Sequence, residues 1–263
     1  GAEARSGAAY EAALADYTRA AVKSNSSMVL LNALQTLIMS IGLFIVAAMA
    51  AALGYGVMNL LMAATPLAMQ VCGLSFEDTA WVLEWHVIGM FAPGFVTGHL
   101  IKRYGVLNVM AVGVVLNVAC IAVALSGTEL DQFLVALFLL GVGWNFLFTG
   151  STTLSMQAYR PEEKNRAQAA INFCVFATMA VTSFASGALV TTQGWTWLNV
   201  GSLLPIGAVT LALSWLALTR TVMNRPWARR PWSKTARNSG CLVNRSDGLS
   251  RWFTRGILHY DET

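Results

Sequence analysis

Long uncharged runs between short charged turns constrain this chain more than any other feature. The first run extends from Ser24 to Phe76 and contains 53 residues without Asp, Glu, Lys or Arg. A helix of about 20 apolar residues crosses a hydrocarbon core that is roughly 30 Å thick. The chain is 56% hydrophobic and 11% charged, whereas soluble domains carry about 25% charged residues. The sequence therefore predicts an all-α polytopic membrane protein rather than a soluble domain.

Six apolar segments have the length and composition of membrane-spanning helices. We expect them at approximately 44–71, 80–101, 106–126, 132–157, 167–190 and 195–219. Residues 1–27 are rich in Ala with mixed charges and predict an exposed cytoplasmic helix. Residues 28–43 would extend this helix along the interface or against the bundle. A single crossing over 44–71 is favoured, and a hairpin that turns near 54–56 is the alternative.

The signs of the charged turns give the predicted spans a direction. Basic residues occur at 102–103, 160–166 and from 220 onward, whereas acidic residues without basic neighbours occur at 77–78 and 129–131. Short cytoplasmic loops of membrane proteins collect Lys and Arg. This pattern predicts an integral protein with both termini cytoplasmic, and we expect the bacterial inner (plasma) membrane as its location.

The C-terminal segment 221–263 differs from the rest of the chain. It holds eight of the 17 Lys and Arg residues, so the basic balance of the chain comes from this tail and does not indicate nucleic-acid binding. We expect a disordered cytoplasmic tail. The alternative is a basic and aromatic patch that binds anionic lipid headgroups.

Several motifs between residues 44 and 220 resemble the C-terminal six-helix half of a major facilitator superfamily transporter. They are YGVMNLLMAATPLAM (55–69), EWHVIGMFAPGFVTGHLIKRYG (84–105), LLGVGWNFLF (139–148), YRPEEKNRAQA (159–169) and GWTWLN (194–199). The resemblance implies two inverted three-helix repeats and alternating-access transport of a small solute, with protons as a candidate coupling ion. It also implies a second six-helix half or a homodimer as partner.

One motif of that family is a cytoplasmic loop of the form G-x-x-x-D-R-x-G. The matching positions here are Gly98, Lys102, Arg103 and Gly105. Lys102 stands where the family has an acid, which puts the charge relay associated with this loop in doubt.

Residues 1–43 resemble a different family, the ABC exporters related to mitochondrial iron–sulfur and glutathione-conjugate export. In those exporters an L-N-x-G-Q turn contributes to the substrate cavity, and the resemblance places Asn32 and Gln35 in that role, with Leu34 at the Gly position. The chain contains no G-x-x-x-x-G-K-[ST] sequence, so it cannot drive transport with ATP by itself. The change of resemblance near 43–46 suggests an incomplete or fused carrier.

Polar residues at membrane depth are the candidates for a solute or proton pathway, because they are costly in lipid and face the bundle interior. A carboxylate at depth can couple to protons, and a histidine titrates near neutral pH. The same side chains can instead lie at headgroup level or form structural hydrogen bonds between helices. The candidates are Glu84, His86, Asn59, Asn145 and Asn172, with Asn117 and Gln168 as weaker ones.

No pattern indicates catalysis, a metal site or a cofactor. There is no H-E-x-x-H or G-x-S-x-G sequence, and the four cysteines are far apart. Trp144, Phe146 and Phe148 are interpreted as helix packing. Two functions remain as alternatives to a secondary transporter half: a non-transporting module that associates with other helices, and a transmembrane fragment of an ABC exporter.

Overall fold

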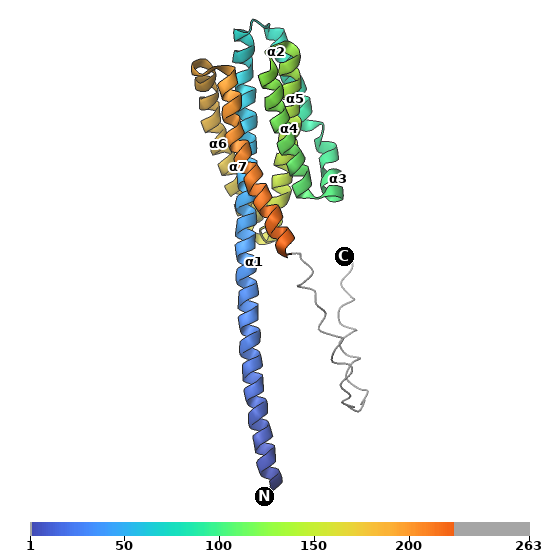
Figure 1. The fold of residues 1–263 in the computed structure, drawn as a ribbon, viewed down its shortest axis with the longest axis vertical. Helices are drawn as coiled ribbons and strands as arrows, with labels where there is room; N and C mark the ends of the chain where they lie inside the picture. Colours follow the sequence, from blue (N-terminus) through green and yellow to red (C-terminus); the bar gives the residue numbers. More distant parts are fainter. Residues whose placement is uncertain (1, 224–263) are drawn as a thin grey trace. The chain divides into compact units, whose positions relative to one another are not determined.

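A computed structural model describes residues 2–223, and residues 224–263, including most of the basic tail, lie outside the described part. Within the described residues all regular structure is helical, as the sequence predicts for its fold class (Figure 1). The helices are α1 (Ala2–Val71), α2 (Phe76–Phe91), α3 (Gly94–Tyr104), α4 (Val106–Ser126), α5 (Leu130–Ser155), the 3-10 helix η1 (Pro161–Glu163), α6 (Lys164–Thr192) and α7 (Gly194–Met223).

The first helix is a single uninterrupted element. α1 contains 70 residues and is about 105 Å long at 1.5 Å per residue. Gly54 and Gly56 lie inside it, so the alternative of a hairpin near these residues is wrong. The helix packs into the bundle from Leu43 onward, whereas residues 14–38 are exposed throughout. In Figure 1 this N-terminal part (blue) extends beyond the ends of α5 and α6.

The segment that we expected to form one helix over 80–101 is divided into two helices. α2 ends at Phe91 and α3 begins at Gly94, with Ala92 and Pro93 between them. Proline has no N–H and its ring clashes with the preceding turn, which explains the position of the break. With 16 and 11 residues, α2 and α3 are about 24 and 17 Å long, so neither spans a bilayer core alone.

Five of the described helices are long and apolar enough to cross a membrane. They are Leu14–Val71 within α1, α4, α5, Pro161–Thr192 and Gly194–Arg220. The sixth predicted crossing therefore depends on α2 and α3 acting as one interrupted span.

Close packing around α5 holds these helices together. α5 contacts α1, α2 and α4, and α1 also contacts α6. The approach of α2 to α5 requires glycine, because a Cβ on Gly141 would lie 2.6 Å from the His86 carbonyl oxygen, and one on Gly89 would lie 2.8 Å from the Phe138 carbonyl oxygen. The core between α1, α4 and α5 consists of Leu140, Trp144, Leu147 and their buried neighbours.

The charged turns lie at opposite ends of this bundle according to their sign. At one end, Arg220 of α7 donates a hydrogen bond from Nη2 to Oε1 of Gln157, which precedes the basic α5–α6 loop, at 3.1 Å. At the other end, Trp195 at the start of α7 donates from Nε1 to the carbonyl oxygen of Ala124, near the acidic α4–α5 turn, at 3.1 Å. The α3–α4 turn lies at the first end in Figure 1.

Candidate functional site

Asn145 joins α5 to both sides of the α2–α3 break. Its side-chain Nδ2 donates to the Met90 carbonyl oxygen at 2.7 Å, and its Oδ1 accepts from Thr97 Oγ1, also at 2.7 Å. Met90 lies in the last turn of α2, where carbonyl groups lack helical N–H partners. We call Asn145, Met90 and Thr97 the Asn145 bridge. It satisfies backbone that the break exposes, which is the way a membrane protein tolerates an interrupted helix.

Asn59 likewise joins two helices, α1 and α6, through side-chain hydrogen bonds. Its Nδ2 lies 2.9 Å from Ser183 Oγ and 3.0 Å from Thr182 Oγ1, and its side chain is buried. Gly56 allows α1 to approach this part of α6, because a Cβ at this position would lie 2.7 Å from Thr178 Cγ2. Asn59 therefore makes the interhelical hydrogen bonds that are common for buried amides in membranes.

His86 and Glu84 lie in different environments on α2. His86 is fully buried, and its Nδ1 is 2.7 Å from the Leu137 carbonyl oxygen, so Nδ1 carries a proton and donates it to this bond. Its Nε2 is enclosed and has no partner among the described residues. Glu84 is exposed, and the two side chains do not form a pair.

The hydrogen bonds of the remaining amide candidates, Asn172 and Asn117, lie within their own helices. Asn172 is exposed on α6 and its Oδ1 lies 3.4 Å from Gln168 Nε2. Asn117 is buried, but its Nδ2 donates to the Gly113 carbonyl oxygen one turn earlier in α4, at 2.8 Å. Each of these two hydrogen bonds therefore stays within one helix, α6 for Asn172 and α4 for Asn117.

The loop motif forms the turn between α3 and α4. Gly105 has a φ of +88°, which favours glycine, and Asn108 Nδ2 donates to the Tyr104 carbonyl oxygen at 2.9 Å. Gly98, Lys102 and Arg103 are exposed. The Arg103 guanidinium lies over the Tyr104 ring, 5.4 Å from its centroid, and within residues 2–223 no ion pair joins Lys102 or Arg103 to an acid.

The cavity residues implied by the ABC-exporter resemblance lie outside the bundle. Asn32 and Gln35 are on the exposed N-terminal part of α1. In the described part of the chain, no group of three His, Cys, Asp or Glu side chains is arranged to hold a metal ion.

An aromatic cluster of Tyr55, Trp144 and Phe148 joins α1 to α5. The Trp144 and Phe148 rings are stacked with centroids 5.1 Å apart, and Tyr55 meets both edge-on at 5.3 and 5.7 Å. The Trp144 Nε1 is enclosed and has no acceptor among the described residues. The sequence predicts helix packing for Trp144 and Phe148. Their i, i+4 spacing indicates a shared helix face, but no local signal reveals Tyr55 as their partner.

Comparison with known families identifies this architecture. The profile described as Major Facilitator Superfamily matches residues 43–258. The chain belongs to the major facilitator superfamily. The match starts at residue 43, so the resemblance of residues 1–43 to ABC exporters finds no support. No solved structure matches the chain.

Several curated members of the superfamily are similar to part of the chain. The riboflavin transporter RfnT of Brucella anthropi is 40% identical over 156 residues, which cover 59% of this chain and 39% of that protein. The 4-hydroxybenzoate transporter PcaK of Pseudomonas putida is 30% identical over 154 residues, 57% of this chain and 34% of its own. The transporter YddS of Bacillus subtilis is 27% identical over 146 residues, 55% and 34% respectively. The chain thus spans about two fifths or less of these relatives.

Proposed function

We propose that this chain is one half of a secondary transporter that carries a small aromatic solute across the bacterial inner membrane. The observation that carries this proposal is the aromatic cluster with its unsatisfied indole N–H. A buried donor without a partner costs about 1–3 kcal/mol. An oxygen of a bound solute that accepts from Trp144 Nε1 would remove this cost.

The chemistry of the cluster favours a planar ring as the solute. Aromatic pairs prefer stacked or edge-to-face contacts with centroids 4.5–7 Å apart, and Tyr55 and Phe148 are half-buried, so a solute ring can replace one of the existing contacts. The printed names of two relatives, transporters of riboflavin and of 4-hydroxybenzoate, support an aromatic solute.

The proposed carrier requires a partner subunit and a defined orientation in the membrane. Transporters of this type place the solute between two bundles that rock against each other, so we propose a second six-helix half or a second copy as partner. The separation of basic and acidic turns supports cytoplasmic termini. Among the polar candidates, His86 is the buried titratable group, and we propose it, with Glu84, as the proton pathway.

A non-transporting, helix-associating module is the second candidate function. The observation that favours it is the exposure of α6, on which Phe173, Phe176 and Phe184 are exposed. A carrier half also exposes such a face before it meets its partner, so only a transport measurement separates the two functions.

The test is uptake of labelled riboflavin and 4-hydroxybenzoate by proteoliposomes that contain the purified chain. We expect saturable uptake of one of them, and Trp144→Phe, which keeps a ring but removes the N–H, should weaken apparent affinity roughly 3- to 10-fold, the value of one hydrogen bond. Trp197→Phe on the exposed face of α7 is the control and should behave as wild type. Equal affinity of the Trp144→Phe variant and the control would contradict the assignment of Trp144 to the solute site, and no uptake of either solute would contradict transport by a pair of identical chains.

The same preparation tests the proton pathway when a pH gradient is imposed. We expect the gradient to accelerate uptake by the wild type and not by His86→Gln or Glu84→Gln, because neither substitute side chain titrates. Acceleration that persists in one variant removes that residue from the pathway.

A further inference from the structure

An exposed aliphatic stripe runs along α1 where it leaves the bundle. It consists of Leu31, Leu34, Ile38, Ile41 and Ile45, and each of these side chains is between 51% and 67% exposed. Their separations alternate between three and four residues. This is the spacing of the a and d positions of a heptad repeat, which places the five side chains along one face of the helix, and the exposed side chains of Leu30 and Leu37 flank this face.

The bundle of this chain does not cover the stripe. On α1, Leu43, Val46 and Ala47 are buried and face the other helices, whereas Ile45 between them is exposed. Gly42 approaches the Trp215 side chain, to which its Cβ would lie 3.6 Å away, and this contact marks the level at which the bundle ends.

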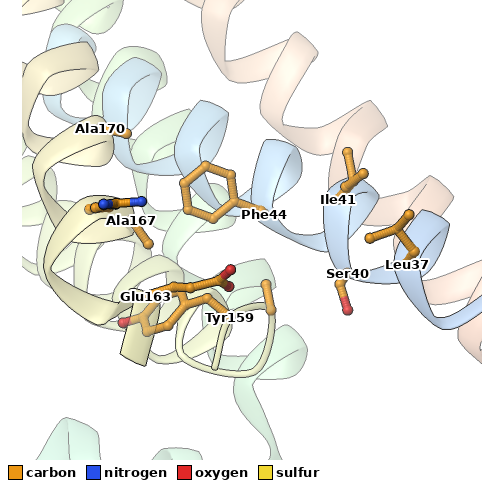
Figure 2. A pocket seen from close by; sticks show the side chains of 10 residues that line it. Leu37, Ser40, Ile41, Phe44, Tyr159, Glu163, Ala167 and Ala170 are labelled. Carbon is orange, nitrogen blue, oxygen red and sulfur yellow. The ribbon is translucent and has the colours of Figure 1, made fainter. Parts of the chain in front are cut away.

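The N-terminal part of the stripe lies beyond the charged end of the bundle. A cavity of about 480 Å³ separates α1 from the start of α6, lined by Phe44 and Ile41 on one side and by Tyr159, Glu163 and Arg166 on the other. Figure 2 shows Phe44 beside the α6 residues and Leu37 further along α1, toward its N-terminus. Leu37 and Ile41 lie at the level of these charged side chains, and Leu31 and Leu34 lie beyond it toward the N-terminus, where exposed Leu is unfavourable unless a partner covers it.

We propose that the stripe is a zipper that joins this chain to a second copy of itself. Copies inserted in one membrane share the same direction, so two α1 helices meet in parallel and each stripe residue faces its own counterpart. Parallel pairing of identical helices brings like charges together wherever charges flank the seam, but no charged residue occurs between Ser24 and Phe76. The seam thus meets the requirements of a parallel coiled coil.

This inference identifies a surface for the copy that the proposed function allows as partner, but it does not depend on transport. The dimer can form in a chain that moves no solute, and a carrier half can pair with a different half. Failure of the zipper and failure of transport are therefore separate results.

Cysteine cross-linking of the full chain in native membranes tests the zipper. In a background without Cys72, Cys120, Cys174 and Cys241, we expect oxidation to yield roughly fivefold more disulfide dimer for Ile38→Cys and Leu34→Cys than for Thr36→Cys, because only seam positions bring two Cβ atoms within disulfide distance. Thr36 is the matched control, since it is exposed on the opposite side of the helix.

Three outcomes would overturn the proposal. Equal yields at Thr36 and Ile38 indicate random collision of copies. A lack of dimer at Leu34 and Ile38, with both cysteines fully reactive toward maleimide, shows that nothing covers the stripe. Protection from maleimide without cross-linking shows that lipid or another protein covers it instead.

Discussion

At the scale of single residues, the buried amides explain how this chain keeps irregular backbone inside a bundle. Asn145 reaches the end of α2 and the first turns of α3 through two bonds of 2.7 Å. Each end of its amide has a different partner, so the hydrophobic replacement of this side chain leaves both a carbonyl and a hydroxyl without their present interhelical partner. In an apolar surrounding such losses are costly.

Asn145→Leu should therefore lower the stability of the purified protein by about 1–3 kcal/mol, the cost of an unsatisfied buried group. Thermal unfolding in detergent, followed by loss of helical signal, measures the change. Asn172→Leu is the control, because Asn172 is exposed on α6, and it should have little effect. Equal stability of the two variants would show that the Asn145 bridge does not support the break.

The sequence identifies Asn145 as a polar residue at depth but cannot show what it binds. Its partners Met90 and Thr97 belong to other helices, and Met90 contributes a backbone carbonyl, which any residue type would provide. His86 illustrates the same limit, since burial and the bond to the Leu137 carbonyl oxygen depend on how α2 lies against α5. Glu84, only two residues away, is exposed, and hydropathy does not distinguish the two faces.

At the scale of helices, the main difference between expectation and structure is the division of the second span. Hydropathy counts apolar residues in a window, and the run from Trp81 to Ile101 satisfies that count. It does not register that Pro93 removes an N–H and ends α2. α1 joins the exposed helix expected over 1–27, its extension over 28–43 and the first span over 44–71 into one element of 70 residues.

The contact of α2 with α5 depends on glycine and gives a prediction at this scale. Gly141→Ala should destabilise the protein by about 1–3 kcal/mol, the usual cost of overpacking, because its Cβ would lie 2.6 Å from the His86 carbonyl oxygen and 2.9 Å from the Met90 nitrogen. These are backbone atoms that cannot rotate away. Thermal unfolding again measures the difference.

Gly201→Ala provides the matched control within α7. Nothing lies within 4 Å of a Cβ at this position, and Ala favours a helix over Gly by about 1 kcal/mol. This variant should be neutral or slightly more stable. If Gly141→Ala is equally well tolerated, α2 and α5 do not approach as closely as described.

At the scale of the whole bundle, the arrangement of charges follows from the number of crossings. Residues 2–220 contain five helices that qualify as spans by length and composition. With α2 and α3 as a sixth, interrupted crossing, the turns with Lys102 and Arg103, the loop with Arg160 and Lys164, and Arg220 all lie on one side of the membrane. Without it, these basic turns would lie on the same side as the acidic Glu77 and Asp78, and on the opposite side from Arg19 and Lys23, against the usual bias.

Membership in the major facilitator superfamily agrees with six crossings, because the match covers residues 43–258 and such carriers are built from six-helix halves. The same count places the aromatic cluster and His86 within the membrane, where a solute and a proton pathway would run. Whether α2 and α3 cross the membrane as one unit therefore decides whether this chain has six spans.

Labelling of single cysteines with a membrane-impermeant maleimide in oriented vesicles tests this claim most directly. Three positions suffice: Ser75 before α2, Tyr104 at the end of α3, and Lys164 at the start of α6. We predict that Tyr104→Cys and Lys164→Cys are labelled from the same side and Ser75→Cys from the opposite side. Labelling of Ser75→Cys and Tyr104→Cys from one side would show that α2 and α3 do not cross the membrane, and would contradict the six-span account.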